Sequence, residues 1–151
     1  MLGCGAVARA VHLPLLRRLR GAHLVAVADP SPSARAAAAR VARVEVGDDP
    51  LALVRDGRVD AVVVCSPSAT HAALGLAVLE AGKHLYLEKP LATTSEEGLR
   101  LVEAAAATGR VAAIGFNRRF HPAYVRIRAA VEKGRLGPVR EVCTAFHEPI
   151  A

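Results

Sequence analysis

Residues 81–90 read Ala-Gly-Lys-His-Leu-Tyr-Leu-Glu-Lys-Pro (AGKHLYLEKP), and this stretch narrows the choice of fold more than any other. Gly82 is typical of the residue that ends a helix, and the run from His84 to Glu88 is a short, apolar strand. That strand leads directly into Lys89-Pro90. Open α/β sheets hold their ligands at the carboxyl ends of their strands. The stretch therefore predicts a lysine ammonium group at the ligand-binding edge of a sheet.

Helix and strand signals alternate on both sides of this stretch and are joined by short links. Apolar and β-branched runs predict strands at residues 24–28, 43–46, 59–65, 84–88 and 111–115, with Met1-Leu2 as the stub of an earlier strand. The segments between them predict helices at residues 6–19, 31–42, 50–56, 70–81, 94–108 and 122–133. This alternation is typical of an α/β fold in which helices cover both faces of a parallel sheet.

Local sequence patterns predict a kink or restart in the first of these helices and the N-terminal caps of two others. Pro14 is expected to kink or restart the first helix, because proline cannot donate a backbone hydrogen bond. Ser31 or Ser33 is able to cap the second. Thr94 to Glu97 has the pattern of a capping box.

Composition excludes several classes of protein. The chain has 151 residues, of which 52% are hydrophobic, so it is long and apolar enough to bury a core. Its net charge is +6, but the basic residues are dispersed and aromatics are only 3%, which favours a solvated basic surface over a nucleic-acid binder. No apolar run reaches the length of a membrane span, so no membrane partner is expected.

The cysteines indicate a reduced, cytoplasmic protein. Cys4, Cys65 and Cys143 are far apart and form neither a CxxC motif nor a zinc-ligand spacing, so no disulfide framework and no metal site are predicted. Leu2-Gly3-Cys4 resembles a lipoprotein cleavage site, but no basic or apolar segment precedes it, and a signal peptide is not predicted.

A glycine-rich turn near the start has the spacing of a dinucleotide-binding fingerprint. Gly3 would make the tight turn, Gly5 would let the backbone approach a pyrophosphate, and Ala8 would let the helix pack closely on the strand. The helix that follows presents its N-terminus to the phosphates. The predicted phosphate-binding residues are Gly3, Cys4, Gly5, Ala6 and Val7.

Asp29 lies about 20 residues after the turn, at the end of the second strand, where a carboxylate can accept hydrogen bonds from a ribose. Its charge would repel a 2′-phosphate, so NAD is favoured and NADP stays an alternative. Arg35 would offset that charge if it folded back, but it is expected on a solvated helix face. The alternative interpretation is an ordinary strand-to-helix turn with a helix-capping Asp29.

Taken together, these segments resemble the Gfo/Idh/MocA family of nicotinamide-dependent oxidoreductases over essentially the whole chain. The resemblance implies a Rossmann-type domain, a doubly wound parallel sheet, over residues 1–137. It implies that residues 138–151 are the linker and first strand of a second, substrate-binding domain, which is otherwise missing. It also implies a truncated first strand, so the chain is expected to begin inside that strand.

The resemblance assigns further residues to the cofactor site. Ser66, Pro67 and His71 match a segment whose backbone lies near the dinucleotide, and Asn117 matches one that reaches the nicotinamide or the substrate. The alternatives are a helix-end histidine without a ligand and, for Asn117, an ordinary loop.

Lys89 is the candidate catalytic residue. It would hydrogen-bond the substrate oxygen and stabilise developing negative charge, and burial beside the nicotinamide would lower its pKa from about 10.4. Glu88 would orient Lys89 or contact a ribose. The alternative is a surface Lys-Pro loop. The family's main acid/base histidine belongs to the second domain, and neither His121 nor His147 matches it.

The predicted function is the NAD(P)-binding portion of an oxidoreductase that transfers hydride between a nicotinamide cofactor and a sugar, cyclitol or related polyol. Two alternatives stay open: an NAD-dependent glycosidase of the same family, and a non-catalytic dinucleotide-binding module. The expected partners are the dinucleotide and a polyol or sugar. A homo-oligomer is compatible with the sequence.

Overall fold

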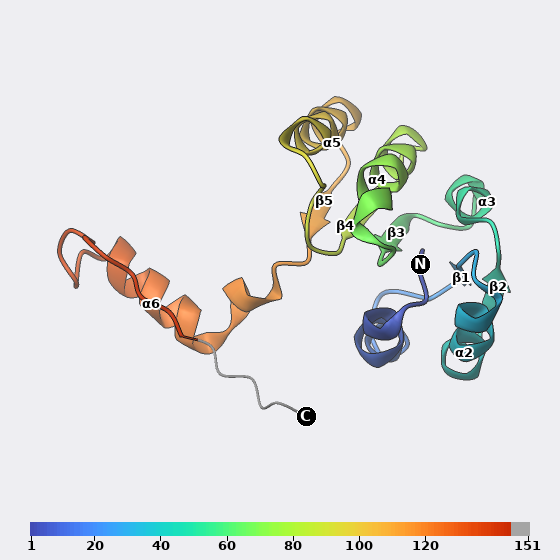
Figure 1. Ribbon diagram of the computed structural model, residues 1–151, viewed down its shortest axis with the longest axis horizontal. Coiled ribbons are helices and arrows are strands. Elements are labelled where there is room, and N and C mark those ends of the chain that lie inside the picture. Colours follow the sequence, from blue (N-terminus) through green and yellow to red (C-terminus); the bar gives the residue numbers. More distant parts are fainter. Residues whose placement is uncertain (146–151) are drawn as a thin grey trace. The chain divides into compact units, whose positions relative to one another are not determined.

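The computed structural model describes residues 1–145 of the chain. These residues form two compact units, Met1–Gly115 and the unit that begins at Phe116, and each is described by itself. Strands of the first unit are β1 (Ala26–Ala28), β2 (Glu45–Gly47), β3 (Ala61–Val64), β4 (His84–Leu87) and β5 (Ala112–Ile114). Its helices are η1 (Ala8–His12), α1 (Leu13–Leu16), α2 (Pro32–Ala42), α3 (Pro50–Arg55), η2 (Ser68–Thr70), α4 (His71–Glu80) and α5 (Ser95–Thr108) (Figure 1).

All strand pairs of the first unit are parallel. One group has the order β1-β2 and the other the order β3-β4-β5. Leu2 joins the two groups, because it bridges Ala28 on one side and Val64 on the other. Its amide donates to the Val63 carbonyl at 2.8 Å, and its carbonyl accepts from the Cys65 amide at 2.7 Å. The prediction of a Rossmann-type parallel α/β sheet is confirmed.

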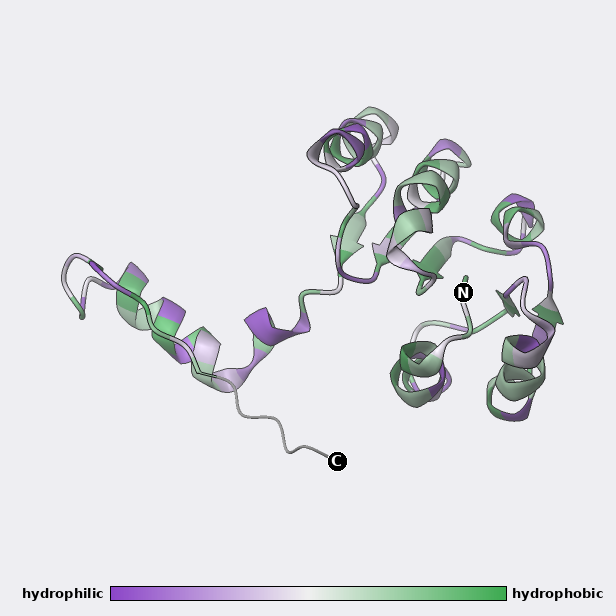
Figure 2. Ribbon diagram, in the orientation of Figure 1, coloured by the Kyte–Doolittle hydropathy of each residue, from purple (hydrophilic) through white to green (hydrophobic). Residues whose placement is uncertain are grey.

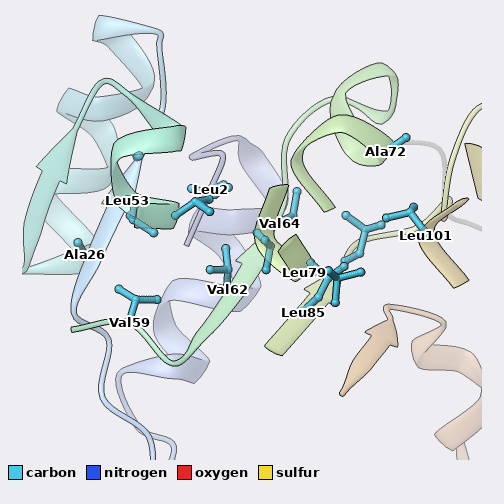
Figure 3. Close-up of a cluster of buried hydrophobic side chains, with 14 residues drawn as sticks. Leu2, Ala26, Leu53, Val59, Val62, Val64, Ala72, Leu79, Leu85 and Leu101 are labelled. Carbon is cyan, nitrogen blue, oxygen red and sulfur yellow. The ribbon is translucent and has the colours of Figure 1, made fainter. Parts of the chain in front are cut away.

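Helices cover both faces of this sheet, as Figure 1 shows. Val62, Val64, Leu85 and Leu87 belong to a buried cluster with residues of α3, α4 and α5, including Leu79 and Leu101 (Figure 3). Val27 belongs to a second cluster, with residues of η1, α1 and α2. Successive strand residues point to opposite faces, so runs such as Ala61–Val64 must be apolar throughout. Accordingly, β3 and β5 are green in Figure 2.

The first helix differs from its predicted form. A single kinked helix over residues 6–19 is replaced by a π-helical turn, η1, that runs directly into the four-residue helix α1. Pro14 is the second residue of α1, directly after the π-helical segment, and its missing N–H cannot continue the helical hydrogen bonds. The irregularity expected near Pro14 is found as this change of helix type, with no break in the helix, and the helix ends at Leu16, three residues earlier than predicted.

The predicted caps are found. The Ser31 hydroxyl accepts from the Ala34 amide at 3.4 Å, so Ser31 is the N-cap of α2. Thr94 and Glu97 form both bonds of the capping box that opens α5. The strands are each one to three residues shorter than predicted, and β2 is shifted to end at Gly47, one residue beyond its predicted end.

The second unit contains η3 (Asn117–Phe120) and α6 (Pro122–Glu132), the latter matching the predicted helix at 122–133. His121 caps α6, accepting from the Ala123 amide at 3.3 Å. The sequence also predicts an extended segment over residues 139–146. Residues 139–145 form no strand, and residue 146 lies outside the described residues. None of the helices within residues 1–145 combines the length and the hydrophobicity needed to cross a bilayer.

Candidate functional site

Residues predicted to bind a dinucleotide lie at the carboxyl ends of the central strands. The glycine turn follows Leu2 directly, Asp29 follows β1, Ser66 follows the residue after β3, and Glu88 follows β4. In parallel α/β sheets this edge is where ligands bind, because loops from neighbouring strands meet there.

Gly3 packs the turn against the loop after β3. Its φ is +85°, a left-handed conformation, and a Cβ added there would lie 2.6 Å from the Cys65 carbonyl group and 2.7 Å from the Ser66 nitrogen. Gly5 is the opposite case, since no atom lies within 4 Å of its Cβ position. Gly5, Ala6 and Val7 are exposed. The turn is thus closed on the protein side and open on the outer side, which fits a phosphate-bearing ligand approaching the backbone.

Asp29 ties this turn to the end of β1. One carboxylate oxygen accepts from the Cys4 amide at 2.7 Å, and the other accepts from the Ser31 amide at 2.8 Å. The side chain therefore stands at the turn itself, where a ribose next to the pyrophosphate would lie. The Asp29 side chain also agrees with the alternative interpretation, an ordinary strand-to-helix turn, because its bond to the Ser31 amide helps to organise the start of α2.

Arg35 does not lie on the solvated face where it was expected. Its guanidinium folds back and donates to the Asp29 and Pro30 carbonyl oxygens, each at 2.9 Å. These bonds from a charged donor hold the guanidinium beside the N-cap of α2. A positive charge is consequently held beside Asp29.

Lys89 is exposed, and its amide donates to the Glu88 carboxylate at 3.0 Å. The burial expected for its side chain is not found in this structure, because β4 ends at Leu87 and Lys89 already belongs to the loop. The buried lysine is Lys83, whose ammonium donates to the carbonyls of Asp56 and Val59. Lys83 therefore has a structural role.

His12 is a residue of this edge that the sequence analysis did not select. Its Nε2 lies 2.8 Å from a carboxylate oxygen of Glu88, and its ring meets Tyr86 edge-on at 5.6 Å. His12 is 8% exposed. In the sequence, His12 is only a polar residue between two apolar positions of the first helix. That pattern does not indicate which residue His12 contacts.

His71, in the segment after β3, is the second buried histidine at this edge of the sheet. The His71 imidazole lies between two backbone carbonyls, with Nδ1 2.6 Å from Pro90 O and Nε2 2.9 Å from Ser66 O. Ser66 accepts from the Thr70 hydroxyl at 2.7 Å. Asn117 begins η3 in the second unit, so its predicted contact with the nicotinamide or substrate stays a prediction.

Two thiols close to the site are protected from reaction. Burial, together with the Asp29 carboxylate, raises the pKa of Cys4, and burial with the Glu88 charge raises the pKa of Cys65 to about 12. Since the thiolate is the reactive form, we expect only exposed Cys143 to react quickly with a disulfide reagent at about pH 8. Cys143→Ser should remove the fast phase, and a second fast thiol in the folded chain would contradict the prediction.

Comparison with known proteins gives one consistent result. Residues 1–116 match the model of the GFO_IDH_MocA oxidoreductase family, described as an NAD-binding Rossmann fold. Inositol 2-dehydrogenase 2 of Saccharopolyspora erythraea is 42% identical over 139 residues, which are 91% of this chain and 41% of the relative. The scyllo-inositol 2-dehydrogenase (NAD(+)) of Bacillus subtilis is 34% identical over 82% of this chain and 36% of its own length.

Solved structures agree with these relatives. The WlbA dehydrogenase of Bordetella pertussis, solved in complex with NADH and UDP-GlcNAcA, has a TM-score of 0.83 and 30% identity, and the match covers 90% of this chain and 42% of that one. The chain spans about two fifths of the length of the curated relatives that it matches.

Proposed function

Because this chain belongs to the Gfo/Idh/MocA oxidoreductase family, with an NAD-binding Rossmann fold over residues 1–116, we propose that it is the cofactor-binding portion of an enzyme that transfers hydride between a nicotinamide cofactor and a polyol. One observation carries the proposal. The helix that follows the glycine turn reaches the Lys89 loop through the 2.8 Å contact of His12 with Glu88. The candidate cofactor turn and the candidate catalytic loop are therefore parts of one site.

The residues of the site are given the following roles. The backbone from Gly3 to Val7 would bind the pyrophosphate, and Asp29 would accept hydrogen bonds from the adenosine ribose. By the resemblance, further contacts to the dinucleotide would come from Ser66, Pro67, Glu88 and the backbone at His71, whose ring is buried. The contact predicted for Asn117, in the second unit, belongs to the same expectation. When bound, NAD would accept a hydride from the substrate carbon.

Lys89 would act on the substrate. Its exposed ammonium is able to hydrogen-bond the reacting hydroxyl oxygen and to stabilise negative charge as the hydroxyl loses its proton. Relatives named inositol 2-dehydrogenases point to a cyclitol among the polyols. Residues 1–137 would form the cofactor domain and 138–151 the start of the substrate domain, in a cytoplasmic protein.

Cofactor choice should favour NAD over NADP, less strongly than Asp29 alone would suggest. The Asp29 carboxylate would repel a 2′-phosphate, whereas the folded-back Arg35 guanidinium partly offsets that charge. In a titration followed by NADH fluorescence, we expect saturable binding of NADH and weaker binding of NADPH. Asp29→Asn should weaken NADH binding about tenfold, the effect of one hydrogen bond to a charged group.

Asp49 offers a matched control. Its carboxylate accepts from the amide two residues ahead, that of Leu51, at 2.8 Å, as Asp29 does with Ser31, but it caps α3. Asp49→Asn should therefore leave NADH binding unchanged. Equal effects of the two substitutions, or no fluorescence change with the unmodified chain, would refute the cofactor site.

Hydride transfer is tested with NAD⁺ and myo-inositol as the probe, by following NADH formation. NADH formation that disappears in Lys89→Ala, with NADH binding retained, would support the oxidoreductase. Saturable NADH binding without NADH formation is expected both of a cofactor-binding portion tested without a substrate domain and of the non-catalytic module. A downstream reading frame that encodes a substrate domain distinguishes the two, because only the oxidoreductase requires it. Sugar release from an aryl glycoside without net NADH would favour the glycosidase.

A further inference from the structure

Buried histidines hold both neighbours of Lys89. His12, the last residue of η1, contacts the Glu88 carboxylate at 2.8 Å. His71, the first residue of α4, contacts the Pro90 carbonyl at 2.6 Å. The two histidines are 8% and 1% exposed, whereas Lys89 between their partners is exposed. Thus the backbone around Lys89 is anchored on both sides while its ammonium stays accessible.

The Glu88 carboxylate is fixed at both oxygens. Oε1 pairs with His12, and Oε2 accepts the Lys89 amide at 3.0 Å. Gly115, the residue after β5, leaves room for the carboxylate, since a Cβ there would lie only 3.2 Å from it. The Glu88 amide also donates to Val64 O at 2.9 Å. Glu88 therefore transmits the position of His12 to the Lys89 backbone.

The His71 ring joins two loops of the candidate site. Its second nitrogen lies 2.9 Å from Ser66 O, in the loop against which the Gly3 turn packs. The buried ring contacts a carbonyl oxygen of each loop, so it packs the Lys89 loop against the loop after β3. The Lys89 loop is consequently held relative to the glycine turn.

We propose that His12 and His71 are positioning residues that fix Lys89 for the reaction, His12 through Glu88 and His71 through Pro90. Neither ring is placed to touch substrate or the reacting atoms. The proposal rests on the proposed function, in which Lys89 is the catalytic group. On this proposal, the position of Lys89 is determined by residues of two helices, η1 and α4, and not by its own loop.

Lysine NMR of the full chain provides the test, because the sequence contains only Lys83, Lys89 and Lys133. In ¹³C-lysine-labelled protein, the buried Lys83 reports on the fold and Lys133, in the second unit, is a reference. Amide exchange of Lys89 is measured without ligand, and the Lys89 side-chain shift is then followed during an NADH titration. The variants are His12→Leu, His12→Gln and His71→Leu, with exposed His23→Gln as the matched control.

We expect His12→Leu and His71→Leu to speed Lys89 amide exchange by about tenfold or more, as local opening becomes easier. Both should reduce the NADH-induced shift of Lys89 while the Lys83 signal is unchanged. His12→Gln should restore the behaviour of the unmodified chain, because its amide group is able to reach Glu88. A merely structural histidine would instead disturb Lys83 and would not be rescued by glutamine.

Unchanged exchange at Lys89 in His12→Leu and His71→Leu would overturn the proposal. Failure of the unmodified chain to respond to NADH would refute the proposed function alone, since exchange at Lys89 is measured without ligand. Should His12→Leu lose the Lys83 signal, Glu88→Ala removes the same contact from the more exposed partner, whose side chain is 18% exposed. Slow Lys89 exchange in Glu88→Ala would equally overturn the role of His12.

Discussion

Gly3→Ala is expected to lower the free energy of unfolding by about 3 kcal/mol or more, the sum of a left-handed backbone penalty and a steric clash. The φ of +85° disfavours any side chain, and the new Cβ would lie 2.6 Å from backbone atoms of Cys65. Those atoms belong to the residue that follows β3 and is hydrogen-bonded to Leu2 at 2.7 Å, so they cannot move aside. Urea unfolding followed by far-UV circular dichroism measures the loss in this tryptophan-free chain.

Gly5→Ala separates the cofactor role of the turn from its structural role. No atom lies within 4 Å of the Gly5 Cβ position, so the free energy of unfolding should change by no more than about 0.5 kcal/mol. A methyl group there would nevertheless stand where a pyrophosphate meets the backbone, and NADH binding should weaken. A stable Gly3→Ala variant would refute the packing argument. A Gly5→Ala variant that binds NADH normally would place the phosphates elsewhere.

Features set by neighbouring residues could be predicted from the sequence. The capping box of Thr94 and Glu97 lies within four residues, and each predicted bond forms. Buried parallel strands could be recognised because both faces of the sheet are covered, which makes runs such as Ala61–Val64 apolar throughout. The glycine turn was identified by a spacing that the close approach of backbones imposes.

Contacts between distant residues could not be predicted in this way. His12 and Glu88 are 76 positions apart, and nothing in either local pattern indicates the other. The return of Arg35 to the Asp29 carbonyl depends on a rotamer choice, and the exposure of Lys89 depends on where β4 ends. Such details follow from packing, whereas periodicity reports only which face of an element is buried.

In a polypeptide that begins at Met1, the free amino group makes stability depend on pH. Met1 is 5% exposed, and its ammonium donates to Ala26 O at 2.8 Å. Burial lowers the pKa of this amine from 8.0 to about 6, because a low-dielectric surrounding disfavours the charged form. Between those values the unfolded chain binds more protons than the folded chain, so stability rises as the pH rises from about 6 to 8.

The expected gain over that interval is about 2 to 3 kcal/mol, with little further change above pH 8 or below pH 6 from this group. Histidines titrate in the same range, so the measurement compares urea midpoints of the chain with those of an N-terminally acetylated form. Acetylation removes the charge but keeps an N–H that can donate to Ala26 O. The difference in unfolding free energy between the two forms should shrink as the pH rises from 6 to 8.

Space for the acetyl group is present beside Met1. A cavity of about 500 Å³ lies at the amino ends of β1 and β3, and Val25, Ala61 and Val63 are among the residues that line it. It is at the edge of the sheet opposite to the glycine turn, so acetylation leaves the candidate site untouched and NADH binding should be the same in both forms. Acetylation should therefore stabilise the folded chain most at pH 6, where the free amine has to be buried with its charge or lose its proton. Parallel pH dependences of the two forms would show that the Met1 amine is hydrated in the folded chain and that the desolvation argument is wrong.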